Sequence, residues 1–346
     1  MPIRTVSVLG GVVQDLTTIT DRLPDDGETV TATSFTMQAG GKGSNSAVAI
    51  YRLTRPNPKN SPIAHQEAVD EDLRVRIVGA VGADEFGPLL RQNLTKCGVN
   101  VDGVRVLEGQ STAVANILVE AASGANRIMQ YPGAAHALKP KEFMTLESLG
   151  GGVAPDLVIM QLEIHRDTIE QAIETAHREG VEVLLNPSPA RYLMPEIYSM
   201  IAHLVMNETE AVMLSECKPD DIVNQTGWTS VAEYFLKLGV KNVVVTLGEK
   251  GAYYENESGS GHVEAEKNCT VLDTSGAGDS FVGAYAAQYM AQKQKGQWDI
   301  KAAVQYGCKA SARVIEHLGC LDPIVWADEV DIPRYPTGVE KTQEIA

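Results

Sequence analysis

The chain has 346 residues, of which 44% are hydrophobic, and this suits one large domain or one domain with a small appendage. A formal net charge of −16 argues against a nucleic-acid binder, which would need a basic face, although backbone amides can still hold a nucleotide in an acidic protein. The five cysteines have neither zinc nor disulfide spacing, and no signal peptide or membrane-spanning stretch is seen, so we expect a chain of the cytoplasm, or also of the nucleus.

The predicted elements alternate between short apolar runs and helical periods. Strands are expected at 5–10, 29–37, 74–81, 157–161, 182–185, 204–206 and 242–246. Helices are expected at 43–52, 167–179, 279–292 and 301–316. This alternation predicts a mostly parallel sheet covered on both faces. The strand at 29–37 and a hairpin at 112–120 and 127–131 fit that scheme poorly and suggest a separate small sheet, such as a lid. The polar, proline-bearing stretch 55–72 suggests a surface insertion.

The segment at 273–281, Asp-Thr-Ser-Gly-Ala-Gly-Asp-Ser-Phe, carries the strongest chemical signal. It places Gly276, Ala277 and Gly278 just before the helix expected from Asp279. Such a junction leaves backbone N–H groups unpaired at the positive end of the helix dipole, where a phosphoryl group could bind with Asp279 as base. Asp is also a common helix N-cap, and for an isolated aspartate that alternative is the stronger one.

A second glycine run, Ala-Gly-Gly-Lys-Gly-Ser-Asn at 39–45, also enters a predicted helix, and it lacks the Walker A spacing. Its amides and Asn45 could bind sugar hydroxyls, or the run is a tight turn. Asp15 follows the first strand, where α/β folds place ligand groups, or it is an ordinary turn aspartate.

Three further groups follow predicted strands. Glu163 comes after residues 157–161, and Asn207 and Glu210 come after residues 204–206. A carboxylate there could hold a water of Mg²⁺, or it could be the charge that suits a helix N-terminus. The run Thr-Leu-Gly-Glu-Lys-Gly at 246–251 could shape a nucleotide pocket, or it is only a turn. The histidines have no metal spacing.

Taken in order over residues 5–330, these motifs resemble the ribokinase branch of the pfkB carbohydrate kinase family. The segments at 40–45 and 273–281 carry the resemblance, and 24–30, 160–163, 186–190 and 207–210 support it. The resemblance implies a three-layer α/β/α sandwich over residues 1–335, with lid strands from about 13–37 and 110–133 and a tail at 336–346. It also implies transfer of the ATP γ-phosphoryl group to the 5-hydroxyl of D-ribose, and a homodimer formed through the lid.

The resemblance also assigns roles by position. Asp279 would be the base, and Gly276, Ala277 and Gly278 would stabilise the transferred group. The sugar would contact residues of four segments: Val13, Asp15, Gly41, Lys42, Gly43, Ser44, Asn45 and Glu163. ATP would contact Asn207, Thr246, Leu247, Gly248, Glu249, Lys250, Gly251 and Cys308. Glu210 would act near Mg²⁺. A K⁺ site would use Asp273, Ser275, Val314, His317 and Gly319.

Two positions depart from the family pattern. Val13 stands where these kinases often have an asparagine, and Pro323 stands where a serine hydroxyl often completes the K⁺ shell. The alternatives are a kinase of the same family for fructose, 2-keto-3-deoxygluconate or a nucleoside, and a non-catalytic sugar or nucleotide sensor. An intact Asp279 argues against the sensor, which has no need of a base.

Overall fold

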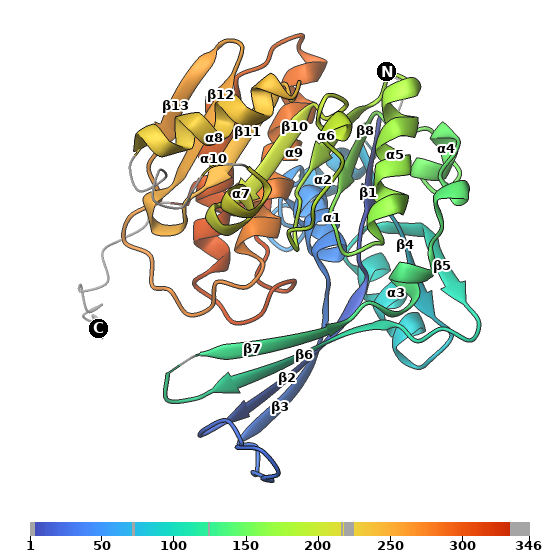
Figure 1. The fold of residues 1–346 in the computed structure, drawn as a ribbon, viewed down its shortest axis with the longest axis vertical. Coiled ribbons are helices and arrows are strands. Elements are labelled where there is room, and N and C mark those ends of the chain that lie inside the picture. The colour runs from blue at the N-terminus through green and yellow to red at the C-terminus, as the bar shows by residue number, and fades with distance from the viewer. Residues whose placement is uncertain (1–3, 71–72, 124, 216, 218–224, 333–346) are drawn as a thin grey trace.

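The computed structural model describes residues 4–70, 73–123, 125–215, 217 and 225–332, so the tail expected at 336–346 lies outside the described residues. Nine strands form the large sheet: β1 (Arg4–Leu9), β4 (Leu73–Gly82), β5 (Asn100–Leu107), β8 (Leu157–Met160), β9 (Glu182–Leu185), β10 (His203–Asn207), β11 (Asn242–Thr246), β12 (Ala252–Asn256) and β13 (Gly259–Val263). Their order is β13-β12-β11-β10-β9-β8-β1-β4-β5, and the antiparallel pairs are β11–β12 and β12–β13 (Figure 1). The predicted mostly parallel sheet is confirmed.

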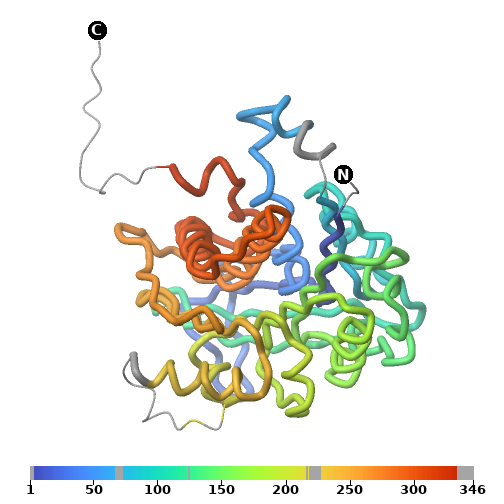
Figure 2. The backbone as a smooth tube through the Cα atoms, turned by 90° about the horizontal axis from the view of Figure 1, so that it is seen from above, coloured from blue at the N-terminus to red at the C-terminus, as the bar shows by residue number. Residues whose placement is uncertain are grey.

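Helices cover both faces of this sheet. One face carries α1 (Lys42–Leu53), α3 (Phe86–Lys96), α9 (Ala277–Gln294) and α10 (Ile300–Val314). The other carries α4 (Leu146–Leu149), α5 (Arg166–Arg178), α6 (Pro195–Tyr198) and α8 (Gln225–Lys237). Figure 2 shows α9 and α10 side by side, on the opposite side of the molecule from α5 and α8. The three-layer α/β/α sandwich is therefore present.

The strands are continuous apolar runs because each buries both of its faces. In β8, Leu157 and Ile159 pack into the core beneath α1 and α9, and Val158 and Met160 pack into the core beneath α5. Side chains alternate across a strand, so a strand between two helical layers needs apolar residues at every position. The parallel direction also brings the carboxyl ends of β1, β8, β9, β10 and β11 to one edge of the sheet.

A second sheet, which we call the lid, projects from that edge (Figure 1). It consists of β2 (Val13–Thr20), β3 (Ser34–Gly40), β6 (Ala113–Glu120) and β7 (Asn126–Tyr131), in the order β3-β2-β6-β7. β2 pairs parallel with β6, and the two outer pairs are antiparallel. The hairpin expected around residues 112–131 is the β6–β7 pair.

Two expectations from the sequence were wrong in part. The strand expected at 29–37 begins only at Ser34 and continues to Gly40, where it pairs with β2. Residues 55–72 are not simply a surface insertion, because they include α2 (Pro62–Asp70) and begin with the buried Arg55. The rings of His65 and Trp326 meet edge to face at 5.2 Å, which holds this stretch against the C-terminal part of the chain. Over the described ranges, no helix has the length and hydropathy of a membrane span.

Candidate functional site

A cavity of about 770 Å³ lies between the lid, the carboxyl edge of the large sheet and the start of α9. The lid strands contribute alternate residues to it: Asp15, Thr17, Ile19, Ser34, Thr36, Gln38, Ala115, Ile117, Val119, Asn126, Ile128 and Gln130. The strand register explains this set, because Asp15 pairs with Gln38 and Ala115, and Ala115 pairs with Gln130. Residues paired across a sheet share a face, so one face of the lid forms a wall of the cavity.

The start of α9 forms the floor of the cavity. Gly276 is the N-cap, with the left-handed φ of 73°, and no side chain caps the helix. A Cβ placed on Gly278 would meet nothing within 4 Å, so the space above this turn is open. The first amides of a helix have no partner within it, and here they adjoin the cavity. The amide of Ala277 differs, because it donates to the Thr274 carbonyl at 3.3 Å.

Asp279 is not the N-cap of α9, since Gly276 holds that position. Its side chain is 6% exposed and lines the cavity. Asn45 Nδ2 donates to Asp279 Oδ2 at 2.8 Å, which links the starts of α1 and α9. Capping therefore does not explain this aspartate, and an acceptor beside an open helix N-terminus is what a general base for phosphoryl transfer requires.

Glu163, which follows β8, contacts the glycine run at 39–45 where that run enters α1. Its Oε2 accepts hydrogen bonds from the amides of Lys42 at 2.8 Å and Gly43 at 3.4 Å, the first residues of α1. Gly43 must be glycine, because a Cβ there would lie 2.6 Å from the Gly10 carbonyl carbon. Glu163 thus caps a helix, and its Oε1 accepts from Gln130 Nε2 of the lid at 3.4 Å.

Burial and the neighbouring charges shift the pKa values of the charged groups at the site. Burial raises the pKa of Glu163 to about 7, and it raises the pKa of Asp15 to about 6. Burial disfavours the Lys42 ammonium, but the charges of Asp279, Glu163, Glu210 and Asp15 outweigh that and raise its pKa. Lys42 is therefore the cation at the centre of four carboxylates.

Another part of the cavity wall is formed by the start of α7 (Glu208–Leu214) and the end of β11. Asn207 Oδ1 accepts the Glu210 amide at 2.8 Å, and Glu210 Oε2 accepts the Asn207 amide at 3.0 Å. This reciprocal pair is a capping box. Both residues and Thr246 line the cavity. The interpretation of Glu210 as a charge at a helix N-terminus was thus correct, and the Asn207 and Glu210 side chains also adjoin the cavity.

Other candidates from the sequence do not line this cavity. They are Val13, Gly43, Ser44, Leu247, Gly248, Glu249, Lys250, Gly251, Ala277, Cys308, Val314 and His317. Val13 packs with Ala113 and Ala115 in a small apolar cluster at the root of the lid. Cys308 packs in the core beneath α1 and α9, Val314 is fully buried, and His317 is exposed. Helix and strand periodicity decides whether each of these side chains points into the cavity, and the sequence motifs alone did not show this.

The candidate K⁺ residues belong to two segments, one before α9 and one at and after the end of α10, and Asp273 joins them. Its Oδ1 accepts the Ser275 amide and its Oδ2 accepts the Gly319 amide, each at 2.9 Å. The Val314 carbonyl already accepts the His317 amide at 3.1 Å. Asp273, Ser275 and Gly319 line the cavity. Within the described ranges, no three His, Cys, Asp or Glu side chains are arranged to hold a metal ion.

Among the cavity-lining residues that sequence reasoning missed are Gln38, Gln130 and Cys320. The alternation of the lid strands could have indicated the two glutamines, but nothing local marked Cys320.

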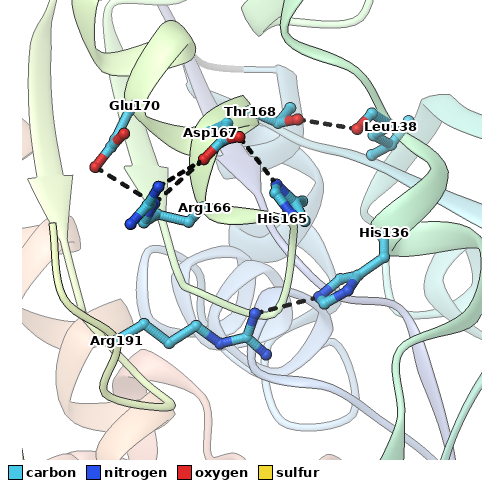
Figure 3. Close-up of polar contacts among 8 residues, drawn as sticks. All are labelled: His136, Leu138, His165, Arg166, Asp167, Thr168, Glu170 and Arg191. Atoms are coloured by element: carbon cyan, nitrogen blue, oxygen red, sulfur yellow. Dashed lines mark hydrogen bonds and ion pairs between the residues drawn. The ribbon is translucent and has the colours of Figure 1, made fainter.

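It also missed a contact in which Arg191 Nη1 lies 3.4 Å from His136 Nε2, while the rings of His136 and His165 are 5.7 Å apart (Figure 3). His136 belongs to a 3₁₀ turn that follows the lid strand β7.

Comparison with known proteins agrees with this geometry. Residues 4–327 match the pfkB family carbohydrate kinases. The ribokinase of Schizosaccharomyces pombe is 35% identical over 329 residues, covering 94% of this chain and 96% of the relative. The deoxyribokinase of Salmonella typhi is 34% identical over 302 residues, 87% of this chain and 89% of the relative.

Solved structures show the same likeness. The Arabidopsis thaliana ribokinase, complexed with ribose and ATP, has a TM-score of 0.80 at 26% identity and covers 95% of this chain and 97% of its own. The Thermotoga maritima ribokinase has a TM-score of 0.78 at 29% identity, with 95% and 98% covered. The match spans nearly the whole described chain and includes both glycine runs of the cavity, so the chain belongs to the pfkB family of carbohydrate kinases.

Proposed function

We propose that this kinase transfers the γ-phosphoryl group of ATP to the 5-hydroxyl of D-ribose, with Asp279 as the base. The observation that carries the proposal is the placement of Asp279 inside the cavity, held by Asn45 beside the open N-terminus of α9. The similarity to ribokinase along 94% of the chain favours ribose as the acceptor.

Each part of the cavity has a task in this reaction. Asp15, Asn45 and the backbone at Gly41 offer acceptors and donors to the sugar hydroxyls. Asp279 takes the proton of the attacking hydroxyl, and the amides of Gly276 and Gly278 stabilise the charge of the transferred group. Lys42 offsets the negative charge that the carboxylates and the phosphates bring together.

Glu163 has an indirect part in sugar binding. It holds the amides of Lys42 and Gly43 and so fixes the loop that carries Asn45, while its second oxygen faces Gln130 of the lid. Glu163 thus acts on sugar binding through this loop, without a direct contact between its carboxylate and the sugar.

ATP fits the end of the cavity lined by Asn207 and Thr246, with its phosphates toward α9. Glu210, which is 5% exposed and lines the same end, would hold Mg²⁺ through its water. When bound, Mg²⁺ neutralises charge on the phosphates. Asp273, Ser275 and Gly319 could offer oxygens to K⁺, but Pro323 supplies no hydroxyl and the Val314 carbonyl already has a donor, so the expected K⁺ shell fits only in part.

2-Deoxy-D-ribose is the second candidate acceptor, because a deoxyribokinase is 34% identical over 87% of this chain. The two sugars differ by one hydroxyl, and a site built to bond that hydroxyl discriminates strongly against the sugar that lacks it.

A coupled assay of ADP formation over a panel of acceptors tests the proposal. The panel contains D-ribose, 2-deoxy-D-ribose, D-fructose, 2-keto-3-deoxygluconate and a nucleoside, each with Mg²⁺ and with or without K⁺. We expect the highest kcat/KM with D-ribose. A higher value for another acceptor would reassign the substrate, and no acceptor-stimulated ATP consumption would favour a sensor.

The outer face of the lid supports the proposed homodimer. Phe35, Met37, Met129 and Tyr131 are all more than half exposed, and they alternate with the residues that face the cavity. Apolar groups on both faces of a thin sheet indicate that the second face is covered too. The five cysteines are free thiols, which agrees with the proposed cytoplasmic location.

A further inference from the structure

Cys320 lies where the two halves of the candidate active site meet. It belongs to the loop after α10, is 8% exposed and lines the cavity. Its Sγ lies 3.6 Å from Asp15 Oδ2, in the geometry of a thiol donating to a carboxylate. A weaker contact of 3.9 Å joins the same Sγ to the Ala39 carbonyl, on the neighbouring lid strand.

The other side of Cys320 packs on the turn that begins α9. A Cβ placed on Gly276 would lie 2.7 Å from the Cys320 carbonyl oxygen and 3.1 Å from the Cys320 Cβ. The turn can therefore approach this closely only because residue 276 is glycine, and it rests directly on Cys320. One residue thus touches both a lid carboxylate and the turn proposed to receive the phosphoryl group.

The Asp15 carboxylate depends on this contact because its surroundings disfavour its charge. Burial and the nearby Asp279 raise the pKa of Asp15, whereas the hydrogen bond from Cys320 and the charge of Lys42 lower it. Asn45, which holds Asp279, also faces the Cys320 thiol. Burial keeps the pKa of that thiol above its usual range, so it remains a donor at neutral pH.

We propose that Cys320 is a positioning residue, whose thiol holds the Asp15 carboxylate ionised and oriented toward the sugar while its backbone supports the turn at Gly276. This inference rests on the proposed function, in which Asp15 binds the acceptor sugar. The opposing interpretation is that residue 320 only fills space, as any small apolar side chain would.

Two substitutions separate these interpretations. Cys320→Ala removes the donor, and Cys320→Ser keeps one. A hydrogen bond to a charged group is worth roughly 1.5–3 kcal/mol, so Cys320→Ala should raise KM for the sugar by roughly 10-fold or more while kcat changes less than about 3-fold. Cys320→Ser should recover most of the loss. Cys217→Ala, at a half-buried cysteine that packs on the opposite core and does not line the cavity, is the matched control and should leave KM unchanged.

The acid limb of the pH profile gives a second readout. Because the thiol lowers the pKa of Asp15, Cys320→Ala should move the acid limb of kcat/KM to higher pH, and Cys320→Ser should move it back. A space-filling role predicts no such movement. Equal KM in wild type and Cys320→Ala, or a serine variant as impaired as the alanine variant with the same melting temperature, would overturn the inference.

A failure of the inference about Cys320 can be distinguished from a failure of the proposed function. The variants are assayed with whichever acceptor the wild type phosphorylates best, and binding of that acceptor is also measured by calorimetry without nucleotide. If D-ribose is not the acceptor, the substrate assignment fails while the role of Cys320 is still tested.

Discussion

Asp279 and Asn45 show how residues far apart in the sequence become one chemical unit. The hydrogen bond of 2.8 Å between them joins the first turns of two helices, although the two residues are 234 positions apart in the chain. The aspartate accepts from Asn45 through one oxygen, which fixes the carboxylate beside the unpaired amides of α9. A base so placed contributes to the rate through position and charge, and hardly to sugar affinity.

We expect Asp279→Asn to abolish most turnover while the sugar still binds. The amide keeps the size of the side chain but cannot take a proton, and acid–base help is usually worth about 10²–10⁴-fold in rate. Steady-state kcat and calorimetric sugar affinity measure the two effects separately. A variant that retains more than roughly a tenth of the wild-type rate would show that Asp279 is not the base.

The buried carboxylates predict an acid limb in the pH profile. Burial raises the pKa of Asp15 to about 6 and that of Glu163 to about 7, so each becomes protonated as pH falls through these values. A protonated carboxyl gives up acceptor capacity, so kcat/KM should fall as pH decreases from about 7 to below 6. Asp15→Asn should lower kcat/KM at neutral pH and flatten the part of the limb near pH 6. A profile without a change across this range would contradict these assignments.

At the scale of elements, α1 and α9 must lie close together so that their N-terminal turns share one cavity. Gly283 permits this approach, because a Cβ there would lie 2.4 Å from the Ala49 Cβ and 3.0 Å from the Ile50 amide nitrogen. Both neighbours belong to α1, and one of them is backbone, so neither can move aside without moving the helix. The separation of these two helices therefore sets the Asn45–Asp279 contact.

Gly283→Ala should destabilise the protein and impair catalysis together. Overpacking of this kind costs roughly 1–3 kcal/mol, and the better helix propensity of alanine offsets only part of that. Thermal unfolding and kcat measure the two effects, with Ala291→Ser on the exposed face of α9 as the control. Unchanged stability would mean that the two helices separate more easily than their packing implies.

At the scale of the whole molecule, the lid carries apolar side chains on both of its faces but has only one cavity to cover. Its inner face lines the cavity, and its outer face exposes Met37 and Met129 at 61% each. Exposed apolar surface on a projecting sheet is a typical contact between subunits. A homodimer through the lid would therefore cover the outer face and hold the sheet over the cavity.

We expect Met129→Glu to shift a dimer toward the monomer and to weaken sugar binding. A charge placed in the apolar contact must be desolvated on association, which opposes dimerisation. Sedimentation velocity at micromolar concentration measures the first effect and KM for the sugar the second. Leu89→Glu, at an exposed position of α3 outside the lid sheet, is the control. A wild-type monomer at these concentrations would contradict the proposed assembly.

The sequence by itself determined the alternation of strands and helices, the parallel character of the sheet and the two glycine runs. These depend on side-chain periodicity and on backbone conformations within a few residues, which are local properties. The hairpin at residues 112–131 and the helix starts near residues 43 and 279 were found for this reason, to within a few residues of β6, β7, α1 and α9.

Only the tertiary structure decided what the polar groups of these segments contact. It showed that Gly276, and not Asp279, is the N-cap of α9, that Glu163 caps α1, and that Cys320 meets Asp15. It also turned Val13 and Cys308 away from the cavity. Contacts between distant segments depend on strand register and helix packing, which no local pattern encodes. The sequence therefore identified the chemistry, and the packing of α1, α9 and the lid decided which side chains are placed to perform it.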